Sequence, residues 1–332
     1  MLDTALSLIY QVAILFLLML PGIILIKKGL VPSTFGKGLS GFVLYIAQPC
    51  LVFLAYLRPY EPKVLDGVLW VLLFSVLAHL IFVVAALLIF RRAPKEKRKM
   101  LHMATIFSNA AFMGLPLIEV LLGGEALLYA TIYNITFNLV LWSLGVYLCT
   151  HDIDPNGDGE QTPAERSELR RAAMRSVGTA FIHPVTIASF LGLLFFFLPI
   201  HEYVPSLLTD TFGMLKSTVA PLSMVVIGLR LATTSLVGMW RDKYLYIFLS
   251  LRHILLPLCV LALLRGTALI FPSLSTTVIQ VVVILASAPA ASSATMFAER
   301  YSCDAGYVGK LVTVSTALSI LTMPPLLLLA TL

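Results

Sequence analysis

The stretch that decides the fold reads Phe107-Ser108-Asn109-Ala110-Ala111-Phe112-Met113-Gly114-Leu115-Pro116 and lies within an apolar segment. Pro116 has no N–H to donate to the carbonyl of Phe112, and its ring clashes with that carbonyl. Gly114 lowers helix preference further. In hydrocarbon, a freed backbone group needs a partner from protein or from a wet cavity. We therefore predict a membrane helix that is broken at Pro116, with the polar pair Ser108 and Asn109 close to the break.

A second stretch repeats this pattern and reads Ala286-Ser287-Ala288-Pro289-Ala290-Ala291-Ser292-Ser293-Ala294-Thr295. Its small residues allow another backbone to approach closely. If Pro116 and Pro289 each begin a half-helix, two helix N-termini point to the middle of the membrane and form an anion site without a basic side chain. The simpler alternative is a structural proline kink, but two equivalent prolines with polar neighbours favour the site.

The composition around these stretches is that of a membrane protein. Apolar residues make up 59% of the 332 residues, charged residues only 12%, and the mean hydropathy is +0.95. A soluble domain is about a quarter charged. Segments of about 20 apolar residues predict membrane helices. We expect ten, near residues 5–26, 38–57, 67–90, 100–122, 127–149, 179–199, 213–232, 244–265, 276–298 and 307–331.

The basic residues follow the connections between these spans. Alternate connections hold 18 of the 23 Lys and Arg residues, which places them in the cytoplasm by the positive-inside rule. The chain is then a multi-pass protein of the cell membrane with both termini outside the cytoplasm. Short basic clusters between apolar spans also argue against a nucleic-acid partner, and leave membrane lipids as the surroundings.

Proline positions divide the spans into two halves. Pro49 and Pro221 are 172 residues apart, and Pro116 and Pro289 are 173 apart. With five spans in each half, the second copy enters the membrane from the opposite side, which is the inverted repeat of many secondary transporters. The predicted domains are a first repeat at 1–149, a polar cytoplasmic linker at 150–178 and a second repeat at 179–332.

These residues also carry a family resemblance that covers nearly the whole chain. The run 109–116 resembles the fourth-helix signature of the auxin efflux carrier family, which includes plant auxin exporters and bacterial carboxylate permeases. Residues 220–229 resemble its seventh helix, and 289–301 and 319–324 resemble its ninth and tenth.

The resemblance implies a scaffold domain from helices 1, 2, 6 and 7 and a mobile transport domain from helices 3–5 and 8–10. It implies a substrate site where helices 4 and 9 cross, with Asn109 as the amide that faces the substrate, and a homodimer formed through the scaffold. Ser293 departs from the family pattern, because many bacterial members have Asn at this position.

Other polar residues in the spans leave alternatives open. Asn134 and Asn138 share a helix face and either line the site or join helices. Gln48 either faces the substrate or satisfies a carbonyl that Pro49 frees. Arg252 either extends to the cytoplasmic face or binds an anion.

Three histidines could couple transport to protons, because histidine titrates near neutral pH. Each lies alone in an apolar run without a carboxylate beside it, which argues against a proton relay. They are His79, His183 and His253.

The sequence predicts a secondary transporter for a small organic anion, a carboxylate or auxin-like acid, that works by elevator-type alternating access. The alternatives are a sodium-coupled carrier of the bile-acid type and a transporter-like ligand sensor. An enzyme would need an intramembrane acid–base pair, nucleophile or metal cluster; we expect neither catalysis nor a metal or cofactor. The expected substrate-binding residues are Asn109, Ser108, Met113, Gly114, Pro116, Ser287, Pro289, Ser292, Ser293, Asn138, Asn134 and Gln48.

Overall fold

The protein is an all-α membrane protein. The computed structural model describes residues 2–150, 182–198, 200–301 and 303–331, and these residues form helices and one isolated β-bridge. Apart from Thr150, the predicted linker lies outside the described residues. The α-helices, several of which are joined end to end by π-helical turns, are α1 Leu2–Leu17, α2 Leu20–Lys27, α3 Phe35–Phe42, α4 Gln48–Tyr56, α5 Pro62–Ile89, α6 Lys95–Ile106, α7 Leu115–Leu121, α8 Gly124–Val140, α9 Val146–Thr150, α11 Pro184–Phe197, α12 Ser206–Ser217, α13 Val219–Thr233, α14 Lys243–Ser250, α15 Leu256–Ile270, α16 Thr276–Ser287, α17 Ser292–Arg300 and α18 Ala305–Thr331.

Many of these helices are long and apolar enough to cross a membrane. In the described part of the chain, seven continuous helices meet this condition. They are Tyr10–Lys27, Phe35–Tyr56, Pro62–Arg92, Gly124–Cys149, Ser206–Thr233, Lys243–Ile270 and Ala305–Thr331. Three shorter apolar helices, Ala110–Leu121, Pro184–Phe197 and Thr276–Ser287, lie in the remaining predicted spans.

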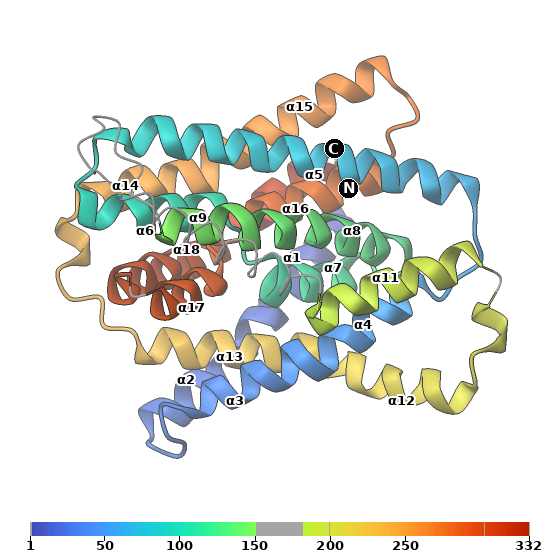
Figure 1. Ribbon diagram of the computed structural model, residues 1–332, viewed down its shortest axis with the longest axis horizontal. Helices are drawn as coiled ribbons and strands as arrows, with labels where there is room; N and C mark the ends of the chain where they lie inside the picture. The colour runs from blue at the N-terminus through green and yellow to red at the C-terminus, as the bar shows by residue number, and fades with distance from the viewer. Residues whose placement is uncertain (1, 151–181, 199, 302, 332) are drawn as a thin grey trace, which may run out of the picture.

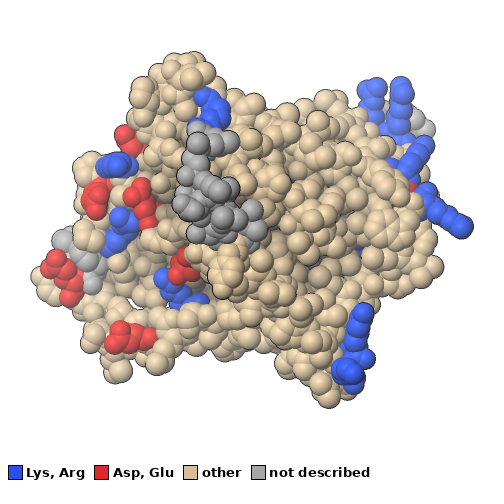
Figure 2. Space-filling model, turned by 180° about the vertical axis from the view of Figure 1, so that it is seen from behind, with Lys and Arg blue, Asp and Glu red and all other residues tan. Residues whose placement is uncertain are grey.

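Charged side chains gather at the two ends of the molecule. Figure 2 shows Lys and Arg almost alone at one end, both signs of charge at the other, and an uncharged surface between them. An uncharged band between two charged ends is the surface that a bilayer requires, since burying a charge in hydrocarbon is costly.

The helices form two groups that pack against each other (Figure 1). One group contains α2, α3, α4, α11, α12 and α13, where α2 packs on α13 and α4 packs on α11 and α12. In the other group α5 packs on α8, and α16 packs on α15 and α18. Helix α4 also contacts α8, so the groups meet along the middle of the protein.

Two glycines allow α2 and α13 to approach closely. A Cβ atom on Gly22 would lie 2.2 Å from the carbonyl oxygen of Val225, and one on Gly228 would lie 2.0 Å from that of Met19. Both distances are shorter than any Cβ contact allows, so only glycine fits at this crossing. This is the small-residue packing by which membrane helices associate.

Three of the prolines inside continuous helices each follow a π-helical turn. The turns Val43–Ala47, Ala110–Gly114 and Leu251–Leu255 end two residues before Pro49, Pro116 and Pro257. A π turn widens the helix and accommodates proline, which cannot donate a backbone N–H to the hydrogen bonds of the helix. The prediction of a break at Pro116 was therefore wrong, because the helix passes through this proline.

Candidate functional site

Two helices are interrupted, and their interruptions cross. Helix α6 ends at Ile106 and the next helical turn starts at Ala110; α16 ends at Ser287 and α17 starts at Ser292. The fourth span is thus broken at residues 107–109, seven residues or more before the proline that was expected to break it. Pro289 does lie in the second interruption, but the half-helix begins three residues after it.

The two interruptions pair as a short antiparallel bridge between Ser108 and Ala290. The N–H of Asn109 donates to the carbonyl of Pro289 over 2.7 Å, and the N–H of Ala291 donates to that of Phe107 over 2.8 Å. The bridge satisfies backbone groups that would otherwise be unpaired in the membrane. Alanines at 288, 290 and 291 have side chains small enough for this approach.

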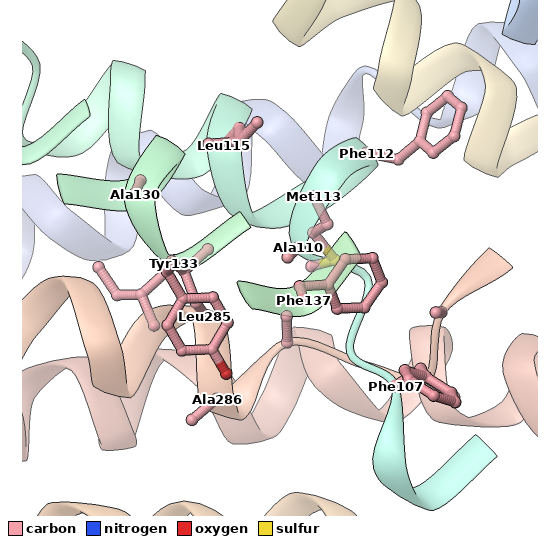
Figure 3. Close-up of a cluster of buried hydrophobic side chains, with 14 of the residues drawn as sticks. Phe107, Ala110, Phe112, Met113, Leu115, Ala130, Tyr133, Phe137, Leu285 and Ala286 are labelled. Carbon is pink, nitrogen blue, oxygen red and sulfur yellow. The ribbon is translucent and has the colours of Figure 1, made fainter. Parts of the chain in front are cut away.

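Apolar side chains pack tightly around the crossing. Figure 3 shows Leu285 and Ala286 of α16 beside Tyr133 of α8, with Phe107 next to the extended segment. A Cβ atom on Gly114 would lie 2.5 Å from Leu285 Cδ2, so this glycine gives the leucine its space. The packing keeps both interruptions away from lipid, which is the condition under which an irregular backbone survives in a membrane.

A cavity of about 180 Å³ lies beside the crossing. Polar side chains from five segments line it, together with aromatic rings. The polar residues are Gln48, Ser108, Asn109, Asn134, Asn138, His183, Ser293 and Arg300. The aromatic residues are Tyr45, Phe112, Phe137, Trp142 and Phe297.

Several of the polar groups around the cavity have no hydrogen-bond partner among the described residues. These buried atoms are Gln48 Oε1, Ser108 Oγ, Asn109 Nδ2 and Asn134 Oδ1. Buried polar groups in proteins are nearly always paired, so unpaired ones on residues that line a cavity mark this place as a candidate ligand site. They come from α4, α8 and the first interruption, and offer both donors and acceptors.

The cavity brings together six of the twelve predicted site residues: Gln48, Ser108, Asn109, Asn134, Asn138 and Ser293. Gln48 lines the cavity, and its Nε2 donates to the carbonyl of Ala111 in another span rather than to a carbonyl that Pro49 frees.

The other six predicted residues do not line the cavity. Met113 borders a much smaller apolar space, and Gly114 packs against Leu285. Pro116 lies in α7, and Ser287 donates to the carbonyl of Ile284 within α16. The carbonyls of Pro289 and Ser292 accept from Asn109 N–H and from Arg230 respectively, so these residues build the crossing.

The sequence prediction missed Arg300 and His183 as cavity residues. Ser293, Met296, Phe297 and Arg300 all line the cavity and lie at the spacing of one helix face, a signal that could have revealed Arg300. Its guanidinium carbon lies 6.0 Å from the ring centroid of Trp142. His183 could only be found from the tertiary structure.

His183 caps helix α11 at the cavity wall. Its Nδ1 accepts from the N–H of Val185 over 3.3 Å, so in the neutral ring the proton is on Nε2. The ring lies 5.4 Å from that of Tyr45. Among the described residues, the remaining N–H donor of His183 has no hydrogen-bond partner.

The other two histidines considered for proton coupling, His79 and His253, do not line the cavity. His79 contacts the carbonyl of Ser75 over 2.7 Å, and His253 lies between Ser315 Oγ at 2.8 Å and Thr322 Oγ1 at 3.0 Å. Among the described residues no cluster of three metal-ligating side chains occurs.

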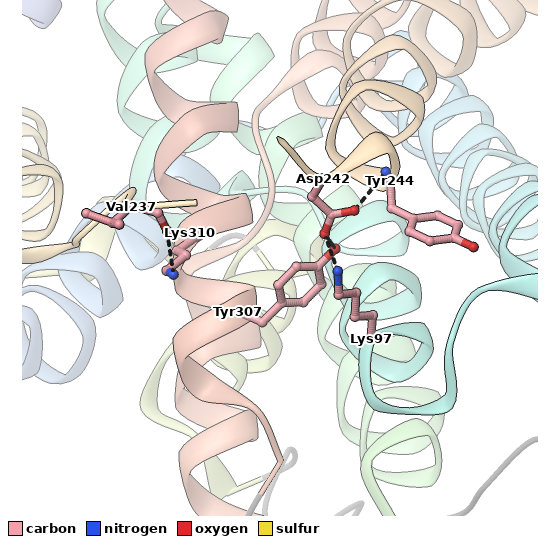
Figure 4. Close-up of polar contacts among 6 residues, drawn as sticks. All are labelled: Lys97, Val237, Asp242, Tyr244, Tyr307 and Lys310. Atoms are coloured by element: carbon pink, nitrogen blue, oxygen red, sulfur yellow. Dashed lines mark hydrogen bonds and ion pairs between the residues drawn. The ribbon is translucent and has the colours of Figure 1, made fainter. Parts of the chain in front are cut away.

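A separate polar cluster fastens three helices at the basic end of the molecule (Figure 4). Asp242 Oδ2 accepts from Lys97 Nζ over 2.8 Å and from Tyr307 OH over 2.9 Å, while Oδ1 accepts from the N–H of Tyr244 over 3.0 Å. Burial raises the pKa of the Asp242 carboxyl, but these hydrogen bonds and the Lys97 charge outweigh it and hold the pKa below its ordinary value. The cluster joins the first turns of α6, α14 and α18.

The fold and the site together define a multi-pass membrane protein with a small polar cavity beside two crossing, interrupted helices. The profile of the family described as membrane transport protein matches residues 7–327. The chain therefore belongs to this family, which confirms the resemblance to auxin efflux carriers, and it is a membrane transporter. None of the curated proteins compared with the chain matches it.

Proposed function

We propose that this protein is a secondary transporter that moves a small organic anion, a carboxylate or an auxin-like acid, across the cell membrane. The observation that carries the proposal is the set of buried, unpartnered polar atoms around the cavity, from Gln48, Ser108, Asn109 and Asn134. Burying an amide or hydroxyl group without a partner costs free energy. Hydrogen bonds from a bound ligand would offset this cost.

The charge of the cavity favours an anion. Arg300 and His183 line it, and none of the described residues that line it is Asp or Glu. Helix α17 begins at Ser292, next to the lining residues Ala291 and Ser293, so its positive dipole end adds to the preference.

The size and the aromatic walls favour an organic substrate with an apolar part. About 180 Å³ is below the range of about 300–1,000 Å³ that is typical of drug-sized ligands. Phe112, Phe137, Trp142 and Phe297 offer flat apolar surface to the rest of such an acid.

The proposed architecture has ten membrane helices in two inverted repeats of five, with both termini outside the cytoplasm. The scaffold would contain helices 1, 2, 6 and 7, and could dimerise; helices 3–5 and 8–10 would form the moving transport domain. Lys216 of α12 and Glu119 of α7 make a 2.8 Å ion pair between these proposed domains. Partly exposed pairs of this kind contribute little to stability and can break as a domain slides.

Transport by the purified protein in liposomes tests the proposal. Labelled mono- and dicarboxylates are supplied with an imposed pH gradient or an imposed sodium gradient. We expect uptake of at least one carboxylate, and a loss of about tenfold or more in Asn109→Ala, because a buried hydrogen-bond donor to a charged group is lost. Gln280→Ala, which removes an amide of α16 outside the cavity, serves as the control and should retain the rate.

The same experiment distinguishes this function from the two alternatives, a sodium-coupled carrier and a ligand sensor. Uptake that requires the sodium gradient would favour the sodium-coupled carrier, and binding without movement of any carboxylate would favour a ligand sensor. Full activity of Asn109→Ala on a transported carboxylate would exclude the proposed site.

A further inference from the structure

Arg252 is the largest fully buried side chain of the described residues, with 0% of its surface exposed. It lies in the π-helical turn Leu251–Leu255 between α14 and α15, in the middle of a continuous apolar helix. The expectation that it extends to the cytoplasmic face is therefore wrong. None of the described carboxylates pairs with it. A lone cation at this depth needs another source of negative charge.

Two helix C-termini supply that charge. Arg252 Nη2 donates to the carbonyl of Ala288 over 2.6 Å, and Nη1 donates to that of Thr105 over 3.4 Å. Ala288 directly follows the last residue of α16, and Thr105 lies in the last turn of α6. The last carbonyls of a helix have no partner within it and carry its partial negative charge. The ring of Phe82 lies 5.0 Å from the guanidinium carbon and adds its own negative face.

The same elements form a cation site in other transporters. Where membrane helices are interrupted, the freed carbonyls and the C-terminal ends of half-helices coordinate exchangeable sodium ions or protons. Here the two C-terminal ends meet at the crossing, but a guanidinium tethered to the chain takes the place of the ion.

We propose that Arg252 is a built-in cation, which permanently fills a carbonyl site between the two interrupted helices. The protein then needs no exchangeable metal cation at this place, and removal of the side chain leaves a site that binds a free monovalent cation. The inference concerns binding and stability, and holds whether or not the substrate is an organic anion.

His253, the residue after Arg252, helps to hold the carbonyl site in position. Nε2 of His253 contacts Ser315 Oγ over 2.8 Å, and this oxygen accepts the N–H of Ala290 over 2.9 Å. Arg252 thus binds the carbonyl of Ala288. His253 is linked through the Ser315 hydroxyl to the backbone N–H of Ala290, in the same 288–291 segment. The backbone bridge between Ser108 and Ala290 is a third attachment. With two of the three attachments intact, the carbonyls of Ala288 and Thr105 stay close together when the guanidinium is removed.

The test measures the thermal unfolding midpoint, Tm, of the full chain in lipid nanodiscs, so it does not depend on transport. We expect Arg252→Ala to lower Tm by several degrees. Guanidinium chloride at millimolar concentration should restore most of this loss, because a ligand that binds only the folded state stabilises it. Sodium and potassium chloride should raise the Tm of this variant above its value in choline chloride at the same ionic strength.

Arg265→Ala is the matched control. Arg265 Nη2 also donates to helix C-terminal carbonyls, those of Ala330 at 3.0 Å and Leu329 at 3.4 Å, but at a partly exposed place that water can reach. Its removal should change Tm little, and guanidinium should not raise the Tm of this variant or of the wild type.

Two further variants separate charge from hydrogen bonding. Arg252→Lys keeps the charge, and Arg252→Gln keeps donors without it; we expect the Lys variant to have the higher Tm. A Gln variant at least as stable as the Lys variant would overturn the proposal. So would an Arg252→Ala protein whose Tm responds to none of the cations. If Arg252→Ala does not fold, the comparison of the Lys and Gln variants decides.

Discussion

The backbone N–H of Asn109 donates to the carbonyl oxygen of Pro289 over 2.7 Å, although the two residues belong to opposite halves of the chain. This bond fixes the backbone of Asn109 while its side-chain Nδ2 stays without a partner at the cavity wall. The residue that joins the two interrupted helices is thus also the one that offers its amide to the cavity. A ligand bound to this amide would act directly on the crossing.

The sign of the substrate charge can be read from Asn109→Asp, which changes charge at nearly constant shape. A buried carboxylate repels an anion, so we expect the apparent affinity for a transported carboxylate to fall by more than in Asn109→Ala. Competition by the unlabelled acid measures it. A tighter apparent affinity in the Asp variant would mean that the site prefers a cation.

The Asp242 cluster predicts a pH-dependent stability. A carboxyl whose folded pKa lies below the unfolded value of about 3.9 adds stability above that pH, and the gain is lost as pH falls through the folded pKa. Asp242→Asn should lower the Tm of the protein near pH 7, by the equivalent of about 1–2 kcal/mol. The difference from the wild type should shrink as the pH is lowered from about 5 to about 3.

Asn can still accept the N–H of Tyr244, so the Asp242→Asn variant isolates the charge. Asp210→Asn at an exposed position is the control and should leave Tm unchanged at every pH. A Tm difference for Asp242→Asn that stays constant across this range would contradict the assignment.

Gly228→Ala should destabilise the packing of α2 on α13. The added Cβ would lie 2.0 Å from the carbonyl oxygen of Met19, so the helices must separate, at a cost of about 1–3 kcal/mol. We expect a clear drop in Tm. Gly213→Ala in α12 has open space around the new methyl group and should leave Tm unchanged or slightly higher, since alanine favours helix. Equal effects of the two substitutions would argue against the close crossing.

Elevator movement predicts that a covalent link between the proposed domains stops transport. Glu119→Cys with Lys216→Cys places two thiols where the ion pair now joins α7 to α12. In a background in which the four native cysteines are replaced, a short bifunctional thiol reagent should abolish uptake. A linked Lys97→Cys/Asp242→Cys pair, which lies within the proposed transport domain, should still allow it. Uptake that continues with the first link in place would exclude relative movement of these two helices.

Several features of the fold and of the site could be predicted from the sequence because their causes are local. Apolar segments of membrane length identify the spans, and the small residues around Pro289 indicate an interruption there. Asn109 could be singled out because an amide in an apolar run needs a partner. These statements depend only on the residue and its neighbours along the chain.

The position of the first interruption could not be predicted this way. Pro116 is the stronger local signal, yet a π turn accommodates it, and the helix opens at residues 107–109 instead. The backbone opens there because the segment 288–291 supplies its hydrogen bonds, and Arg252 takes the carbonyl of Thr105. All of these partners are remote in sequence.

By itself, then, the sequence determined that the chain is a helical membrane transporter with polar and small residues in two of its spans. Only the tertiary structure decided where those spans open, that His183 completes the cavity, and that Arg252 fills the space between two helix ends. The physical reason is that hydrophobic length is a property of a single segment. A broken helix, in contrast, is stable only where other segments satisfy its backbone, and the positions of those segments are fixed by the packing of the whole chain.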